Sequence, residues 1–203
     1  AQLSGLQSTD MADFTSTQLQ ALSASQVAAL GSTNLNALDS TQMGALTTTQ
    51  IKGLTTVQLE NLEAGDIAEL TSTQIGALST VQLSKISSEN IGELTSTQLQ
   101  GLTSQQLGSL TTTALSAIDT AEIATLTTTQ TAGLTATQLR TIESADFDKF
   151  TETQVKALSA SQLGALSTTN LSSLTSTEAQ ALTETQLKGL TASQLGGIDS
   201  ADI

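Results

Sequence analysis

Cysteine, proline, histidine, tryptophan and tyrosine are all missing from this 203-residue sequence, and phenylalanine occurs only three times. Without cysteine there is no disulfide framework. Without histidine and cysteine, the usual zinc ligands and the usual partners of a nucleophilic serine are also missing. No apolar run approaches the roughly 18 residues that a membrane-spanning helix needs. We therefore expect a protein that is not an enzyme, inserts into no membrane and has no evident small-molecule substrate.

Basic residues are also scarce, at six Lys and Arg against 19 Asp and Glu, which gives a net charge of -13. A nucleic-acid surface needs clustered basic side chains, and here the basic residues are scattered along the chain. They are Lys52, Lys85, Arg140, Lys149, Lys156 and Lys188. We therefore expect no nucleic-acid partner, and take the partners to be neighbouring repeats or copies of the chain itself.

What the sequence does contain is one eight-residue unit, repeated without insertion or deletion. Numbering its positions from Thr15 to Leu22, the eighth position is always Leu, Ile or Phe. The fifth position is Leu, Ile, Val, Met or Phe except at Thr131 and Ala179, and the fourth is Gln, Asn, Asp or Glu except at Ala114. Twelve of the 14 glycines fall at positions six and seven, so small residues separate the two apolar ones.

A period of eight does not fit one long helix, because eight residues at about 100° each turn the apolar stripe by about 80° per unit. It does not fit a simple strand either, because residues three apart point to opposite faces of a strand. One helical turn does bring residues three apart to the same side. Each octad is therefore predicted to contain its own short helix.

Capping chemistry supports this prediction. Thr15 and Gln18 have the spacing of a capping box, in which each side chain binds the backbone N–H of the other residue. Phe14 and Leu19 stand at the two positions of a hydrophobic staple around that cap. Because a new cap follows every eight residues and such short helices are unstable alone, the octads must stack. The fold class predicted is an all-α solenoid of very short capped helices, with Leu and Ile inside, Ser, Thr and Gln outside, and small residues letting coils approach. A β-solenoid is the alternative.

The whole chain, residues 1–203, is predicted to be a single repeat array. It has 24 complete octads from residue 7 to residue 198 and partial units at both ends, as expected of a segment of a longer protein. Acids replace the first residue of some octads, and these acids recur every 80 residues; they are Asp39, Glu63, Asp119, Glu143 and Asp199. This indicates a super-repeat, 39–118 and 119–198. Either a block was duplicated, or variant octads mark one corner of a solenoid in which every third or fourth unit returns to the same edge.

The acid-rich octads contain carboxylates three residues apart. The pairs are Glu63 with Asp66, Asp119 with Glu122, Glu143 with Asp146, and Asp199 with Asp202. Stacked carboxylates could bind calcium, so these eight residues are candidate calcium ligands, although no EF-hand loop is present. The same residues also fit an acidic capping box, at helix starts that favour negative charge. We favour the capping interpretation, and predict no other cofactor.

Threonine triplets such as Thr47-Thr48-Thr49 raise a further alternative, an ice-binding surface. Such a surface needs one flat face with regularly spaced threonines. Here the octads carry these threonines whichever way they face, so the threonines do not collect on one face. Capping already explains the first threonine of each triplet. Ice binding therefore remains only an alternative function.

The run from Leu46 to Leu54, Leu-Thr-Thr-Thr-Gln-Ile-x-x-Leu, has many close copies along the chain. It resembles the LTxxQ octad tracts of giant bacterial surface or secreted proteins that are described as adhesin-like. The resemblance implies an extracellular or cell-surface bacterial setting and a role as a structural repeat module, either a spacer or stalk or a self-assembling scaffold. A calcium-stabilised adhesive module is the other alternative function.

Overall fold

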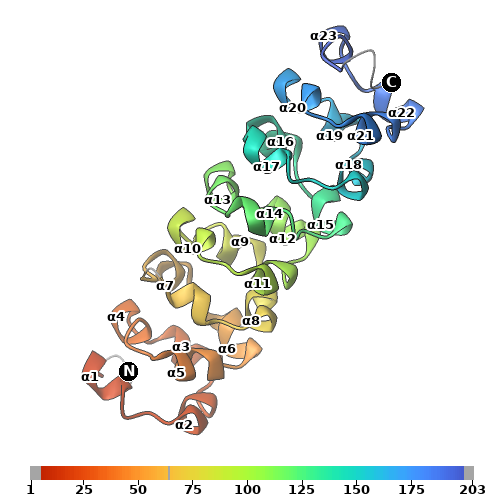
Figure 1. Cartoon of the computed structure of the whole chain (residues 1–203). Coiled ribbons are helices and arrows are strands. Elements are labelled where there is room, and N and C mark those ends of the chain that lie inside the picture. Colours follow the sequence, from red (N-terminus) through yellow and green to blue (C-terminus); the bar gives the residue numbers. More distant parts are fainter. Residues whose placement is uncertain (1–5, 64, 199–203) are drawn as a thin grey trace. The chain divides into compact units, whose positions relative to one another are not determined.

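The computed structural model describes residues 6–63 and 65–198, and these residues form short helices and no strand. The helices have four to six residues each and are joined by extended linkers of a few residues (Figure 1). The chain divides into two compact units, residues 1–102 and 103–203. The all-α prediction is confirmed, and the β-solenoid alternative is not supported.

The first unit contains α1 (Ser8–Met11), α2 (Ser16–Gln20), α3 (Ala24–Ala28), α4 (Ser32–Leu35), α5 (Ser40–Ala45), α6 (Thr48–Gly53), α7 (Thr56–Glu60), the 3-10 helix η2 (Asp66–Glu69), α8 (Ser72–Ala77), α9 (Thr80–Leu83), α10 (Ser88–Gly92) and α11 (Ser96–Gln100). The second unit contains α12 (Ser104–Gly108), α13 (Thr112–Ser116), α14 (Thr120–Ile123), α15 (Thr128–Ala132), α16 (Ala136–Thr141), α17 (Ser144–Phe147), α18 (Glu152–Ala157), α19 (Ala160–Leu163), α20 (Thr168–Ser172), α21 (Ser176–Gln180), α22 (Glu184–Leu187) and α23 (Ala192–Leu195). None of these helices is long and apolar enough to cross a bilayer.

The predicted capping box starts most of the helices. In α6, the backbone N–H of Gln50 donates to Thr47 Oγ1 at 3.3 Å, and the N–H of Thr47 donates to Gln50 Oε1 at 2.8 Å. Thr47 itself is extended, with φ -71° and ψ 155°, so the chain cannot enter α6 as a continuation of α5. Each capped helix therefore starts at its own cap and ends before the next one.

Within each unit, helices three octads apart lie against one another. In the first unit α1 contacts α4 and α4 contacts α7, so that these helices are stacked along one edge (Figure 1). In the second unit α12 contacts α15, and α15 contacts α18. Hydrogen bonds between successive coils join residues 25 to 31 positions apart. One coil therefore takes between three and four octads. This agrees with the prediction that every third or fourth octad returns to the same edge of the solenoid.

The core consists of the apolar residues at positions five and eight. Leu19, Ile51 and Leu59 at position five are completely buried. The residues at position eight are nearly so from Leu30 onward. The two positions that depart from the apolar pattern, Thr131 and Ala179, are buried as well. Two apolar side chains per octad thus supply almost all of the apolar core, and their burial provides the main driving force for stacking.

The expectation that glutamine lies outside with serine and threonine is wrong. Gln50 is only 1% exposed. Its Nε2 donates to the backbone carbonyls of Leu19 and Leu22, at 2.6 and 2.8 Å, in the preceding coil. Gln58 binds Val27 and Leu30 in the same way, at 2.9 Å to each carbonyl. The fourth-position glutamine is buried because it caps its own helix through Oε1 and joins two coils through Nε2.

The small residues at positions six and seven do allow close approach, as predicted. A Cβ atom on Gly76 would lie 2.5 Å from the carbonyl oxygen of Gly101 in the next coil. Gly108 faces Gly133 at the same distance, and so does Gly164 facing Gly189. Because real Cβ atoms essentially never approach a carbonyl oxygen so closely, these three pairs of coils are held closer together than alanine would permit.

The two roles of the glutamine can be separated by mutation. Gln50→Ala removes the capping box and leaves two carbonyls without their side-chain donor, so we expect it to lower the free energy of unfolding by about 2–4 kcal/mol. Gln18→Ala is the matched control. Gln18 has the same capping box, but its Nε2 donates to no group of the described chain, so we expect a loss of only about 1 kcal/mol. Urea unfolding followed by circular dichroism measures both, and equal losses would contradict the coil-joining role.

Alanine substitutions test the close approach of the coils. Gly108→Ala would bring a methyl group against the carbonyl of Gly133, and we expect a net loss of about 1–2 kcal/mol. Gly44→Ala, at the same octad position, meets only the carbonyl oxygen of Glu69 at an ordinary 3.6 Å. There the better helix propensity of alanine should instead stabilise the fold by up to about 1 kcal/mol. Thermal unfolding measures both variants. Melting temperatures that shift in the same direction for Gly108→Ala and Gly44→Ala would argue against the predicted steric difference.

Candidate functional site

The acidic octads are the part of the chain where the repeat changes chemically, and the structure gathers them into two groups. The first acidic group, in residues 1–102, consists of Asp39, Glu63, Asp66 and Glu69. The second acidic group, in residues 103–203, consists of Asp119, Glu122, Glu143 and Asp146. In each group, two octads 24 residues apart are stacked in neighbouring coils, α5 with η2 and α14 with α17. The remaining predicted pair, Asp199 and Asp202, lies outside the described residues.

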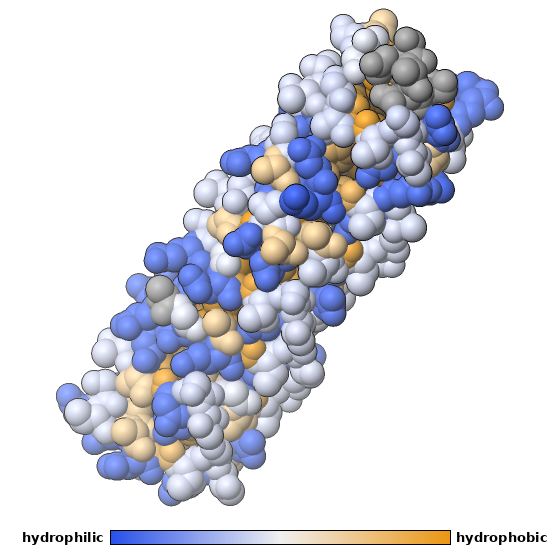
Figure 2. Space-filling model, viewed as in Figure 1, coloured by the Kyte–Doolittle hydropathy of each residue, from blue (hydrophilic) through white to orange (hydrophobic). Residues whose placement is uncertain are grey.

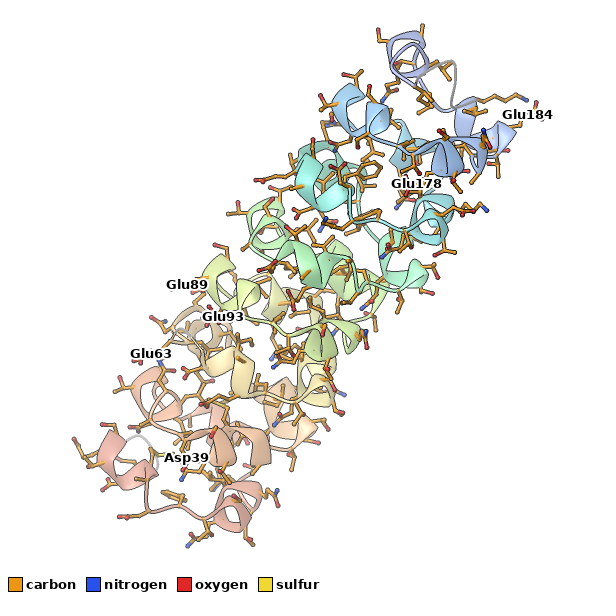
Figure 3. All side chains as sticks on the ribbon, in the orientation of Figure 1. Asp39, Glu63, Glu89, Glu93, Glu178 and Glu184 are labelled. Atoms are coloured by element: carbon orange, nitrogen blue, oxygen red, sulfur yellow. The ribbon has the colours of Figure 1, made fainter. Side chains whose placement is uncertain are left out.

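In the first acidic group, Asp39 caps α5, and its Oδ1 accepts from the N–H of Gln42 at 2.8 Å. Asp66 Oδ2 accepts from the N–H of Glu63 at 2.9 Å, which is one half of a capping box. The Glu63 side chain is exposed and caps nothing (Figure 3). Gly65 follows at a left-handed φ of 94°, and η2 forms in place of an α-helix. Among the described octads, this is the one that forms a 3-10 helix and not an α-helix.

In the second acidic group, Asp119 Oδ1 accepts from the N–H of Ala121 at 3.1 Å, whereas Glu143 makes no side-chain cap. Asp146 is only 7% exposed. Its Oδ1 accepts from Thr120 Oγ1 of the preceding coil at 2.9 Å. Asp146 stands at the fourth position, where glutamine normally donates to carbonyls of the preceding coil. An ionised carboxylate can only accept hydrogen bonds, so it cannot replace those donors.

The proximity of like charges and burial raise the pKa of three of these groups. Burial raises the pKa of Asp146 above its ordinary value of 3.8, and the negative charges of Glu143 and Asp119 add to this, although the Thr120 hydrogen bond opposes it. Burial likewise raises the pKa of Asp66, and the charge of Glu63 contributes. Burial raises the pKa of Glu69 in the same way, as do the charges of Asp66 and Asp39. All three groups are destabilised in their charged form.

This geometry bears on both interpretations of the carboxylate pairs. Asp39 and Asp119 each cap a helix, and Asp66 forms half of a capping box, so the capping interpretation holds for these three residues. It does not hold for Glu63 and Glu143. Within residues 6–63 and 65–198, no three Asp or Glu side chains are arranged so as to hold a metal ion. The assignment of calcium to these pairs therefore stays a prediction.

Sequence reasoning missed two participants, Glu69 and Thr120. Glu69 occupies the seventh position, where most octads have a small residue, and that substitution is the signal that could have identified it. One of its carboxylate oxygens, Oε2, is buried without a hydrogen-bond partner. Thr120 stands at the second position, where most other octads also have Ser or Thr, so nothing in the sequence distinguishes it.

Outside the two groups, the visible surface is mainly hydrophilic or neutral, and apolar residues show between the helices (Figure 2). Glu63, Glu89 and Glu93 lie along one edge of the first unit (Figure 3). The ion pairs Lys85–Glu60, Lys156–Glu152 and Lys188–Glu184 join exposed side chains at 2.9, 2.5 and 2.6 Å. Exposed pairs of this kind contribute at most about 1 kcal/mol each. The surface charge thus stabilises the fold little.

The raised pKa values predict an unusual response to acid. The folded chain holds a proton on Asp146 more tightly than the unfolded chain does, so this group's contribution to stability rises as pH falls through its folded pKa toward 3.8. Asp146→Asn removes the charge, and an asparagine here can donate to the preceding coil, as Asn170 does to the carbonyl of Ile142 at 3.2 Å. We expect the variant to be more stable than the wild type at pH 7 by roughly 1 kcal/mol.

The difference between the two proteins should shrink as pH falls from 7 to 4, because a growing fraction of the folded wild type carries a proton on Asp146. Urea unfolding at a series of pH values measures it. Asp148→Asn, on the exposed side of the same octad, is the control and should show no such convergence. If the free energies of unfolding of Asp146→Asn and the wild type differ by the same amount at pH 7 and pH 4, the buried charge of Asp146 is not the cause of the difference.

Comparison with known proteins identifies the repeat. A family profile described as the ALTTAQ repeat matches residues 3–40, 29–56, 59–96 and 139–176. The matches fall in both units and together span more than half of the chain. No curated protein sequence matches the chain. The chain therefore belongs to the ALTTAQ repeat family.

Proposed function

We propose that this chain is a structural repeat module that serves as a spacer or scaffold in a bacterial protein located at the cell surface or outside the cell. It carries out no reaction of its own. In this role the array separates the parts of a larger protein, and its length is set by the number of octads.

The observation that carries this proposal is that one kind of contact between coils recurs along each unit. The amides of Gln50 and Gln58 in the first unit, and of Gln138 in the second, each bind the carbonyls 31 and 28 residues earlier. The aliphatic pairs that accompany them are equally regular. Most of the buried polar side chains are thus engaged in joining coils, as expected of a part whose task is to extend.

Two further features support the proposed setting. The net charge of -13 favours solubility and repulsion between neighbouring chains, as a long exposed array requires. The LTxxQ octads resemble the tracts of giant bacterial surface or secreted proteins. This resemblance supports the surface setting.

Tandem duplication of residues 39–118 tests the spacer role. The insertion adds ten octads, or about three coils, and keeps every octad in phase. Because packed helices are 8–10 Å apart, we expect the maximum dimension in small-angle X-ray scattering to grow by about 25–30 Å, with an unchanged helical signal per residue. An 80-residue insertion of the same composition in scrambled order is the control, and it should add no helical signal.

A maximum dimension that does not grow with added octads would refute the spacer proposal. The same samples distinguish the spacer proposal from the two alternative functions. A melting temperature that rises with calcium in the wild type, but not in Glu63→Gln/Asp66→Asn, would favour a calcium-stabilised adhesive module. Thermal hysteresis of ice growth would favour an ice-binding protein. Protease treatment of intact cells tests the location, because only an exposed array is cleaved.

A further inference from the structure

Two of the described octads depart from the usual third-position residue in the same way. Position three is polar or small in the other described octads, as at Thr49 and Thr73, but it is valine at Val57 and Val81. These two valines are 59% and 62% exposed, more than any other large apolar side chain of the described chain. Single apolar residues are common on protein surfaces, so the two valines matter only if the fold brings them together.

The fold does bring them together. Val57 lies in α7 and Val81 lies in α9, and these two helices contact each other in neighbouring coils of the first unit. Because both valines hold the same octad position on stacked helices, they project from the same side of that unit. The ion pair between Glu60 Oε1 and Lys85 Nζ, at 2.9 Å, crosses the same boundary between the two coils. We call Val57, Val81, Glu60 and Lys85 the valine patch.

Hydrogen bonding and charge both allow this patch to be covered. The carbonyl of Val57 accepts from Asn61 Nδ2 at 2.8 Å, and the carbonyl of Val81 accepts from Ser84 Oγ at 2.8 Å. A partner that covers the patch therefore leaves neither carbonyl without a hydrogen bond. The charges of Glu60 and Lys85 cancel, so the patch is neutral in a chain whose net charge is -13. Two copies can thus meet here despite the repulsion between whole chains.

We propose that the valine patch joins the chain to a second copy of itself, about a twofold axis that passes between α7 and α9. Such an axis places each Val57 against the partner's Val81, and each Glu60 beside the partner's Lys85. The patch is therefore complementary to itself in both its apolar and its charged residues, as an isologous contact requires. This pairing rests on the scaffold role in the proposed function and names the partner.

The second unit has no equivalent patch, so the association should stop at the dimer. The positions 80 residues after Val57 and Val81 are Thr137 and Ser161, and Arg140 stands where Glu60 stands in the first unit. A twofold contact also uses the same surface on both copies, which leaves no copy of it open for a third chain. Because two valines per copy make a small contact, we expect the dimer to be weak and transient.

The second unit also supplies the variant that removes the apolar part of the patch. Val57→Thr/Val81→Ser introduces the residues found at positions 137 and 161, where α16 and α19 form the corresponding contact between coils. We expect this variant to fold like the wild type in circular dichroism and thermal unfolding, and to lose at least about tenfold in association constant. Thr73→Ala, at the exposed third position of α8 and outside the patch, is the matched control and should associate like the wild type.

Charge reversal tests the orientation of the two copies. Glu60→Lys leaves two lysines on the patch and Lys85→Glu leaves two glutamates, so the twofold axis opposes like charges in each variant. We therefore expect each variant alone to associate less than the wild type. An equimolar mixture of the two sets lysines against glutamates and should form a 1:1 dimer about as strong as that of the wild type. Circular dichroism establishes that both variants are folded, as expected because an exposed ion pair contributes little to stability.

Sedimentation velocity at protein concentrations up to about 1 mM measures all of these proteins. We expect the wild type to form monomers and dimers and nothing longer. The proposal is overturned if the wild type stays monomeric or forms longer species, if Val57→Thr/Val81→Ser associates like the wild type, or if the mixture associates no more than either charge variant alone. None of these failures touches the spacer proposal, because the increase in length on duplicating residues 39–118 is measured on dilute monomers.

Discussion

The fold depends on one side chain that binds in two directions, the fourth-position glutamine. Its oxygen accepts from the N–H of the cap residue and so starts a helix, and its nitrogen reaches carbonyls of the preceding coil. Those carbonyls belong to the end of a helix and have few partners within it. One amide thus satisfies the start of one helix and the end of another, and the local and the long-range structure form together. An aliphatic core alone would bring coils together, but it would not fix their register.

The local structure was readable from the sequence because it depends on residues three apart. The period, the boxes at Thr15 and Thr47, and the small residues at positions six and seven predicted where helices begin and why coils approach closely. The second role of glutamine was not predicted, because a capping box accounts for Gln50 completely. Only the position of the preceding coil reveals that its nitrogen is buried against carbonyls. An exposed and a buried glutamine have the same sequence signal.

The acidic octads show a similar limit. Their carboxylate pairs were visible in the sequence, and helix capping accounted for Asp119. The burial of Asp146 and its bond to Thr120 were not predictable, since they depend on which octad of the neighbouring coil lies opposite. Asn90 and Asn170 illustrate the same point. Both donate to a carbonyl 28 residues earlier, yet Asn170 also accepts from Ser144, whereas Asn90 Oδ1 is buried without a partner.

The short reach of the hydrogen bonds that join coils has a consequence for how the chain acquires its structure. The longest of them, such as the bond from Gln50 to Leu19, span 31 residues, so no element has to wait for a distant part of the sequence. Low contact order of this kind favours rapid folding that spreads from one nucleus to its neighbours. When about four octads have emerged from a ribosome, or from any narrow passage, they already contain both sides of the first contact between two coils. The array can then fold progressively from its leading end, at a rate set by its emergence and not by its length.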